Sequence, residues 1–417
     1  MNINNLAIAL IFTVVVAACP AVAADHSGHG KPGVAASTAE PVDKEKRWKE
    51  ALAKPSLAIT ASFDEKGRLW LAAIRGQHIY VSYSDDRGVT QSAPVKVNAE
   101  PENILGDGEN RPKIIVRKGA IYVSYTQGLE KPMSGDIRFS HSTDGGKSFS
   151  QPLTVNDNRE VISHRFDSMA VNDKGHVYIA WLDKRDLSAA QKTGEKYSGA
   201  AIYYAMSDDS GASFRRNVKI ADHVCECCRT AMTVDTDGYP VVIWRHIYET
   251  NIRDHALVKL DGKMTPVRLS HENWNTASCP HHGPSISIAS DGIYHAAWFS
   301  NAPQQHGLFY AHSTDQGKTF SSPLNFGNFE AQPAHPYVLS VGNRVYLVWK
   351  EFDGESTGLL GMNSSDGGKS WSAPGKLATT SDVSDWPMLI GENNRAYLSW
   401  NTRNEGYRLI EVSVEIK

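Results

Sequence analysis

Two short segments hold four of the five cysteines of this 417-residue chain. The first is Cys225-Glu226-Cys227-Cys228, and the second is Cys279-Pro280-His281-His282. Thiolates and imidazoles are the ligands that Cu(I) and Zn²⁺ prefer. The spacing matches no standard zinc motif, so the prediction depends on the fold bringing the two segments together. The predicted copper or zinc ligands are Cys225, Cys227, Cys228, Cys279, His281 and His282.

The same cysteines are compatible with other chemistry. Four cysteines in an exported protein commonly form two disulfides. The adjacent residues Cys227 and Cys228 are unsuited to pair with each other, so one arrangement joins Cys225 to Cys228 and Cys227 to Cys279. Thiol redox chemistry is a third alternative, and one disulfide combined with a His-rich metal site is a fourth.

Three arginines form a second group with chemical potential. Arg111, Arg165 and Arg229 occupy equivalent positions in three consecutive units of a repeat. Three guanidinium groups that converge on one channel would bind a carboxylate well. The alternative is that each arginine pairs with a neighbouring carboxylate, such as Asp167 or Asp183.

The elements that must position these residues are revealed by a recurring turn, Ser-x-Asp-x-Gly-x-x-Phe/Trp. Asp and Ser side chains bind main-chain amides in such a turn, Gly adopts the positive φ that it needs, and the aromatic residue is buried beyond it. A fifth copy, Ser84–Gly88, has Gln91 in place of the aromatic residue. The full copies are 142–149, 207–214, 313–320 and 364–371.

Each of these turns belongs to a longer unit of predicted strands that recurs along the chain. The second strand of the unit ends in Tyr or Trp. Those strand ends are Tyr125, Trp181, Trp244, Trp298, Trp349 and Trp400. The units begin near Pro55, Arg111, Arg165, Arg229, His282, His335 and Trp386. Such repeats predict an all-β propeller of four-stranded antiparallel blades. We expect seven blades, the last completed by an N-terminal strand, with six as the alternative.

The turn resembles the Asp-box of the sialidase superfamily, over roughly residues 55–417. The resemblance implies a β-propeller, and sialidases are six-bladed. It also implies an arginine triad for the substrate carboxylate, a Tyr nucleophile with a Glu partner, and an Asp acid/base. The corresponding candidates are Tyr248 with Glu249, and Asp183. The Phe-Arg-Ile-Pro motif of the family is absent, and Asn110-Arg111-Pro112 is the nearest match.

Loop positions indicate where a site should lie. The turns between third and fourth strands mark the back of the propeller. The loops that lead into each first strand, and those between second and third strands, share the front. The latter loops are long at 183–199 and 245–254, and enlarged loops on one face usually carry function. Cys228 and His282 are one repeat apart, so their loops should be neighbours on this front face.

The N-terminus predicts export. Residues 1–23 read as a signal peptide, and Val16-Ala17-Ala18-Cys19 also resembles a lipobox that would anchor the chain through Cys19. Residues 24–54 read as a flexible tail in which His26 and His29 form a candidate auxiliary metal-binding segment. The propeller is expected over 55–417, in the periplasm or secreted.

Composition narrows the partners. The formal net charge is −3, which predicts no binding to nucleic acid, and no later segment is apolar enough to cross a membrane. We expect a monomer that binds a transition metal, or a partner protein, at its front face. The alternative is an exo-sialidase or related glycoside hydrolase that acts on a small anionic or sugar ligand.

Overall fold

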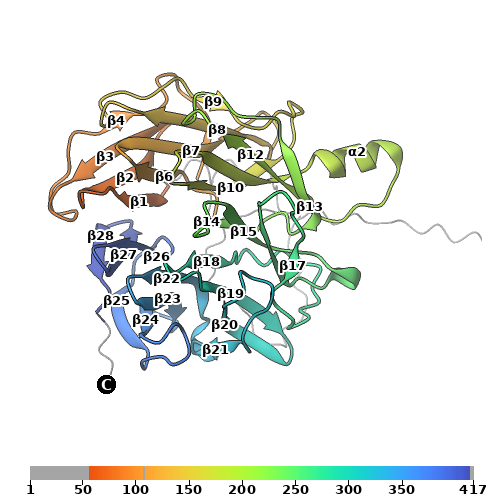
Figure 1. Cartoon of the computed structure of the whole chain (residues 1–417), viewed down its shortest axis with the longest axis vertical. Helices are drawn as coiled ribbons and strands as arrows, with labels where there is room; N and C mark the ends of the chain where they lie inside the picture. Colours follow the sequence, from red (N-terminus) through yellow and green to blue (C-terminus); the bar gives the residue numbers. More distant parts are fainter. Residues whose placement is uncertain (1–55, 107–108, 414–417) are drawn as a thin grey trace, which may run out of the picture.

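The chain folds as a seven-bladed β-propeller of small antiparallel sheets (Figure 1). The computed structural model describes residues 56–106 and 109–413. This confirms the predicted all-β architecture and the count of seven blades. Four N-terminal predictions lie outside the described residues. They are the signal peptide, the lipid anchor at Cys19, the His-containing tail and the strand that would complete the seventh blade.

The first three blades contain the strands up to residue 224, in chain order. Blade 1 consists of β1 (Ile59–Phe63), β2 (Leu69–Arg75), β3 (His78–Ser84) and β4 (Val95–Lys96). Blade 2 consists of β5 (Ile104–Leu105), β6 (Lys113–Arg117), β7 (Ala120–Gly128), β8 (Gly135–Ser142) and β9 (Leu153–Thr154). Blade 3 consists of β10 (His164–Val171), β11 (Val177–Asp183), β12 (Ala200–Ser207) and β13 (Val218–Val224).

The other four blades follow the same pattern. Blade 4 consists of β14 (Ala231–Val234), β15 (Pro240–Arg245), β16 (His255–Lys259) and β17 (Val267–Arg268). Blade 5 consists of β18 (Ser285–Ile288), β19 (Tyr294–Ala302), β20 (Gln305–Ser313) and β21 (Leu324–Phe326). Blade 6 consists of β22 (Ala334–Val341), β23 (Arg344–Phe352), β24 (Thr357–Ser364) and β25 (Gly375–Thr380). Blade 7 has β26 (Met388–Glu392), β27 (Arg395–Thr402) and β28 (Gly406–Glu411) within the described residues.

The innermost strands of the seven blades form a ring. They are β1, β6, β10, β14, β18, β22 and β26. Each inner strand packs beside that of the next blade, and β26 packs beside β1, which closes the circle. Two inner strands, β10 and β22, contain register shifts, between Arg165 and Ser168 and between Ala334 and Tyr337. At these bulges Phe166 and His335 have φ values of 59° and 51°. Such bulges change the direction in which a side chain points.

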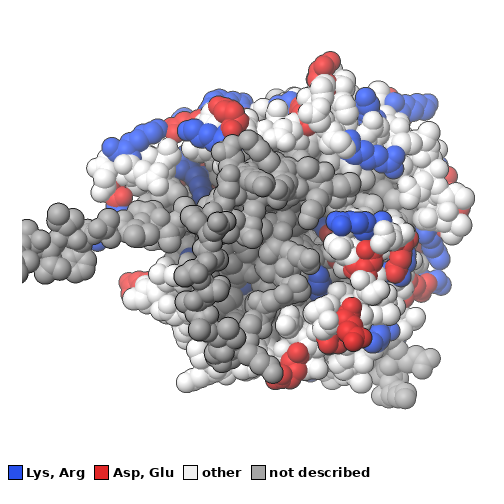
Figure 2. Space-filling model, turned by 180° about the vertical axis from the view of Figure 1, so that it is seen from behind, with Lys and Arg blue, Asp and Glu red and all other residues white. Residues whose placement is uncertain are grey.

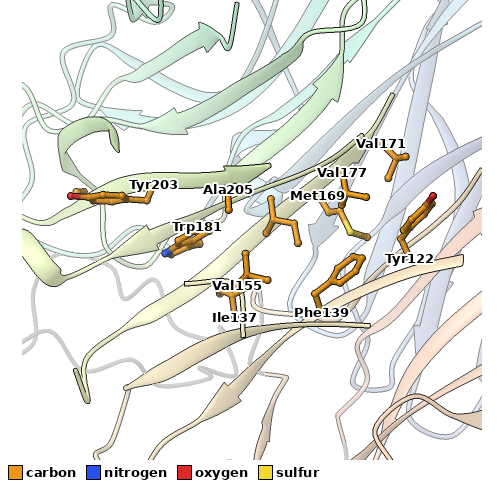
Figure 3. Close-up of a cluster of buried hydrophobic side chains, with 12 residues drawn as sticks. Tyr122, Ile137, Phe139, Val155, Met169, Val171, Val177, Trp181, Tyr203 and Ala205 are labelled. Atoms are coloured by element: carbon orange, nitrogen blue, oxygen red, sulfur yellow. The ribbon is translucent and has the colours of Figure 1, made fainter. Parts of the chain in front are cut away.

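The hydrophobic core is divided among the interfaces between blades. The cluster between blades 2 and 3 is typical, since Phe139 of β8 packs with Met169 of β10 and Trp181 of β11 (Figure 3). The aromatic residues predicted to end the second strands are all buried: Tyr125, Trp181, Trp244, Trp298, Trp349 and Trp400. Burial of these large rings is a main contribution to the cohesion of neighbouring blades.

The repeated Ser-x-Asp-x-Gly turns share one hydrogen-bond pattern. In blade 2 the Ser142 hydroxyl donates to Asp144 Oδ1 at 2.8 Å and accepts from the amide of Gly146 at 3.0 Å. Gly146 has a φ of 78°, and a Cβ there would lie 2.8 Å from the Trp70 ring. The same contacts occur around Asp86, Asp209, Asp315 and Asp366.

Between residues 56 and 413, apart from 107–108, three short helical segments lie in the loops. They are α2 (Arg185–Thr193), η1 (Glu249–Asn251) and η2 (Phe329–Ala331). The first two lie in the long loops predicted at 183–199 and 245–254, although the helix α2 was not expected. Lys and Arg are interspersed with Asp and Glu on the described surface seen in Figure 2. Within the described ranges, no helix has the length and apolar character needed to cross a membrane.

Candidate functional site

The first cysteine segment begins where β13 ends. The amide of Cys225 donates to the carbonyl of Arg245 at the end of β15, at 2.9 Å. The amide of Ile247 donates to the carbonyl of His223 at 2.7 Å. These bonds fasten the segment to the long front loop of blade 4, so that the following turn places Cys227 and Cys228 beside Cys225 in the interior.

The three sulfur atoms of this segment form a compact buried group. Cys225 Sγ lies 3.9 Å from Cys227 Sγ and 3.3 Å from Cys228 Sγ, and all three atoms lie within 4.8 Å of one another. Each residue is buried, and their thiols are free. Three soft donors at this spacing make a group that could hold a metal ion.

The second cysteine segment meets the first. Cys279 packs against the three buried cysteines. Its thiol is hydrogen-bonded with the thiols of Cys225 and Cys227. The predicted approach of the two loops across the junction of blades 4 and 5 is therefore present in the structure. Glu226, which separates Cys225 from Cys227, is ion-paired with Lys184.

Arg253 connects the two segments. Its Nη1 donates to Cys225 Sγ at 3.3 Å, and its Nε donates to the carbonyl of Thr276 at 2.9 Å. Its main-chain carbonyl accepts from Arg245, whose other guanidinium nitrogen donates to the carbonyls of His282 at 3.0 Å and Phe299 at 2.7 Å. The two buried arginines thus hold the loops around the sulfur atoms and bring positive charge next to them.

The surroundings favour a single thiolate in the metal-free group. Hydrogen bonds from Cys227, Cys228 and Cys279 lower the pKa of Cys225 well below its usual value, and Arg253 acts in the same direction. Burial raises the pKa of Cys227 and of Cys228, and the charge on Cys225 raises both further. One negative charge is therefore stabilised, and further thiolates require a cation in the group.

The sulfur geometry is close to that of a metal–thiolate centre. Tetrahedral Zn²⁺ with Zn–S bonds of about 2.3 Å separates its sulfurs by roughly 3.8 Å. The distance between Cys225 and Cys227 matches this value, and the distance to Cys228 is shorter. A disulfide needs about 2.05 Å between sulfurs. The donor set fits a soft ion, and Cys279 supplies a fourth sulfur next to the group.

The two predicted histidine ligands follow Cys279 in the second cysteine segment. The ring of His282 stacks on Phe299, with centroids 4.2 Å apart, and lies 4.7 Å from the ring of His335. His335 in turn stacks on Trp386 at 4.0 Å. His281 is half-buried, with a φ of 54°. These ring contacts place His282 in an aromatic row at the channel, and its role as a ligand stays a prediction.

Two of the three arginines are ion-paired with carboxylates that sequence reasoning did not identify, and the position of all three at the central channel stays a prediction. Arg111 pairs with Asp385 of blade 7. Arg229 donates from Nη1 to Glu109 Oε1 at 3.0 Å. Arg165 is buried, and its guanidinium lies 4.9 Å from the ring centroid of Phe166. Carboxylate binding by all three together remains a prediction.

Other charged groups lie close to these arginines. Lys113 of β6 lies 3.5 Å from the buried Asp167, which also accepts from Ser124 at 2.6 Å. Burial lowers the pKa of Lys113, and the charges of Arg111 and Arg229 add to this shift. The same two arginines oppose the rise in pKa that burial causes at Tyr337. The phenol of Tyr337 therefore lies within reach of the charges of two arginines.

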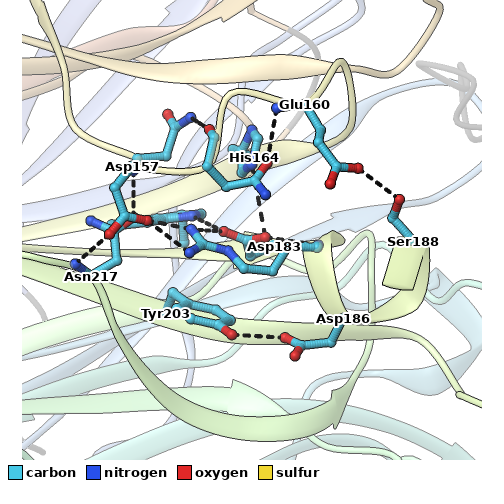
Figure 4. A network of polar contacts seen from close by, with 12 residues as sticks. Asp157, Glu160, His164, Asp183, Asp186, Ser188, Tyr203 and Asn217 are labelled. Carbon is cyan, nitrogen blue, oxygen red and sulfur yellow. Dashed lines mark hydrogen bonds and ion pairs between the residues drawn. The ribbon is translucent and has the colours of Figure 1, made fainter. Parts of the chain in front are cut away.

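Asp183, the candidate acid/base, is engaged in a local network. Its carboxylate accepts from Trp181 Nε1 at 2.9 Å, and from the Arg185 guanidinium at 2.8 Å and main-chain amide at 2.9 Å (Figure 4). His164 Nε2 lies 3.8 Å away. These bonds position the start of α2, and the catalytic role stays untested.

Tyr248 and Glu249, the candidate nucleophile and partner, lie at the start of η1. The Tyr248 ring contacts His246 at 4.4 Å between centroids, and the Arg268 guanidinium lies 4.4 Å above it. Burial raises the pKa of Tyr248, so the phenol stays protonated at neutral pH. Glu249 is exposed. Their proposed chemistry is likewise untested by the geometry.

Sequence reasoning missed Glu109 and Arg253, the residues that organise the two groups. Glu109 precedes Arg111 by two residues and could have been suspected as part of the same loop. Arg253 lies at the end of the long loop 245–254, but no pattern distinguishes it from other arginines. Both act through long-range contacts that become visible only in the fold.

No family model matches the chain. Among solved structures, an ulvan lyase of polysaccharide lyase family PL25, bound to -[GlcA(1-4)Rha3S]-, is similar at 11% identity, with a TM-score of 0.51, over 84% of this chain and 90% of that chain. The polysaccharide lyase Uly1 is similar at 8% identity, with a TM-score of 0.52, over 87% and 91%. A Hadza microbial sialidase, Hz136, has 12% identity and a TM-score of 0.47, over 83% and 73%. The likeness to the two lyases supports the propeller fold.

Proposed function

We propose that this protein is an exported metal-binding propeller that holds copper or zinc through its front-face cysteines. The observation that carries the proposal is the buried group of Cys225, Cys227 and Cys228, with sulfur atoms within 4.8 Å of one another. Cys279 packs against the group and completes a set of four sulfurs. Soft thiolates favour Cu(I) and Zn²⁺ over hard cations such as Mg²⁺.

The residues around the sulfurs support a preformed centre. Arg253 bonds to Cys225 and to the loop that carries Cys279, so both loops keep their positions without a metal. The binding of a cation then replaces the protons of the neutral thiols. Export is part of the same proposal. Residues 1–23 would act as the export signal, and the protein would work in the periplasm or outside the cell.

Metal analysis of protein purified from the periplasm without chelators tests this function. We expect about one copper or zinc ion per chain, and loss of that ion when Cys227 and Cys279 are both replaced by Ser. Equal metal content in the variant would contradict the proposal. Thiol titration of the same samples distinguishes a metal centre from disulfides, because only bound thiols become reactive when a chelator is added.

A second candidate function is the binding or cleavage of an acidic sugar at the channel. The positive charges of Arg111 and Arg229 act on Tyr337, and the same two arginines act on Lys113, which favours this candidate. The ulvan lyase bound to -[GlcA(1-4)Rha3S]- has a similar fold. A fluorogenic sialoside assay from acid to neutral pH and a lyase assay on ulvan test it. The absence of both activities in metal-loaded and metal-free protein would remove the enzyme reading.

A further inference from the structure

The carboxylate of Glu109 contacts residues of blades that are not next to its own. Glu109 lies in blade 2, between β5 and β6, and its side chain is 1% exposed. Its partners are Arg229 before β14, Gly283 before β18, and His335 in β22. These residues belong to blades 4, 5 and 6, none of which adjoins blade 2. The carboxylate must therefore sit at the channel, among the loops that lead into the inner strands.

Three N–H groups donate hydrogen bonds to this carboxylate, and a histidine ring nitrogen lies close to it. Arg229 donates from its main-chain amide to Oε2 at 2.8 Å and from Nη1 to Oε1 at 3.0 Å. The amide of Gly283 lies 2.9 Å from both oxygens. His335 Nδ1 lies 3.5 Å from Oε1. We call these donor groups of Arg229, Gly283 and His335 the cradle. Charge-assisted hydrogen bonds of this kind are the strong ones in proteins.

The cradle is built by the scaffold and does not depend on the loop of Glu109. A Cβ at position 283 would lie 2.2 Å from Arg229 Cγ and 2.7 Å from the Arg229 carbonyl oxygen. Only glycine lets the amide of this residue come so close to Arg229. The bulge at His335, with its φ of 51°, turns that ring toward the same point. Residues of three blades thus converge on one anion.

Other features of the channel suit an incoming anion. Nη2 of Arg229 makes a long contact, 3.5 Å, with the carbonyl of Pro336. Arg111 and Lys113 lie near enough for their charges, with that of Arg229, to act on neighbouring groups. Trp386 stacks on His335 and offers an apolar surface beside the cradle.

We propose that the cradle is a binding site for the carboxylate of an external ligand, and that Glu109 occupies it as an internal ligand which the external carboxylate displaces. Two of the donors are main-chain amides and one arginine takes part, so the site differs from a triad of arginines. It is independent of the proposed metal function. Displacement lowers the apparent affinity by the fraction of molecules in which Glu109 holds the site.

The first test asks whether the cradle accepts a free carboxylate. In Glu109→Ala, the donors lose their partner, so the melting temperature falls. We expect acetate to bind this variant with a dissociation constant of about millimolar and to recover part of the loss, whereas the neutral isostere acetamide does not. The matched control is Glu102→Ala, because Glu102 is also buried but accepts from the single guanidinium of Arg138 at 2.9 Å. Equal recovery by acetamide, or equal recovery of both variants by acetate, would overturn the proposal.

The second test asks whether Glu109 competes with a ligand in the intact protein. Glu109→Gln keeps the side-chain volume but removes the charge, and it also serves if the alanine variant fails to fold. We expect D-glucuronate, a sugar-borne carboxylate, to bind this variant at least about tenfold more tightly than the wild type by calorimetry, with D-glucose as the uncharged control. Equal affinities, or no glucuronate binding by either protein, would show that Glu109 is a permanent structural residue.

Discussion

The sulfur atoms of Cys225 and Cys228 lie 3.3 Å apart, between two chemical outcomes. A disulfide would shorten the distance to about 2.05 Å, and a tetrahedral metal–thiolate centre would lengthen it to roughly 3.8 Å. Either change requires a small movement of one loop. The two outcomes use the same sulfurs, so oxidation and metal binding exclude each other.

This competition predicts that the redox state controls metal binding. Protein reduced and exchanged into oxygen-free buffer should bind about one Cu(I) or Zn²⁺ per chain, measured by competition with a chromogenic chelator. Protein oxidised beforehand should bind much less. The variant Cys227→Ser/Cys279→Ser should lose the metal but keep its β-sheet circular dichroism, and Ser278→Ala serves as the control. Undiminished binding after oxidation would show that the sulfurs are not the ligands.

Arg253 should determine how tightly the metal is held. Replacement by Met removes the bond to Cys225 Sγ and the bond to Thr276 while it keeps the apolar stem. Groups that orient metal ligands typically change affinity about 10- to 100-fold, so we expect a loss of that order in a chelator competition. Arg268→Met is the control, because Arg268 contacts Asp254 and Asn273 instead of a sulfur. An equal loss in both variants would assign the effect to general loosening of the loop.

The repeated turns should make stability depend on pH in the acid range. Hydrogen bonds from Thr319 hold the pKa of Asp315 at about 2, below the value of about 3.9 expected in the unfolded chain. A lowered folded pKa stabilises the protein above pH 4 and loses this effect as the pH falls to about 2. Asp315→Asn should therefore melt at a lower temperature than the wild type at pH 6, and the difference should shrink between pH 4 and pH 2. A constant difference would contradict this account.

Asp366→Ala tests whether the turns are purely structural. Asp366 accepts from the amides of Lys369 and Ser370 at 3.0 and 2.9 Å and from the hydroxyl of Ser364 at 2.7 Å. Loss of these bonds should reduce the free energy of unfolding in urea by about 1 kcal/mol. Metal content should stay unchanged. A metal defect without a stability defect would mean that this face of the propeller takes part in function.

The architecture was predictable because each unit repeats its own local rules. The turn pattern and the aromatic strand ends recur at one-blade intervals, and residues such as Trp181 and Trp400 are buried in equivalent positions. The same spacing predicted that the loop of Cys228 would meet the loop of Cys279. Neither prediction required knowledge of long-range contacts.

The partners of the arginines were not predictable in this way. The alternative to a carboxylate-binding triad was pairing with neighbouring carboxylates such as Asp167 and Asp183, but Arg229 pairs with Glu109, 120 residues earlier, and Arg111 pairs with Asp385, 274 residues later. Such pairs depend on loop conformation across the channel and on closure of the ring. A local pattern in one sequence contains no information about either.

The contacts of Glu109 also order the events of biosynthesis. Glu109 leaves the ribosome 120 residues before Arg229 and 174 residues before Gly283, and these partners directly follow the two cysteine segments. Its contact with Gly283 therefore forms only after the chain has reached the start of blade 5, and its contact with His335 only after the chain has reached blade 6. We expect the thiols to be accessible until then to oxidants and metal carriers in the surrounding compartment. The nascent chain's surroundings, rather than those of the finished protein, decide which of the two meets the sulfurs first.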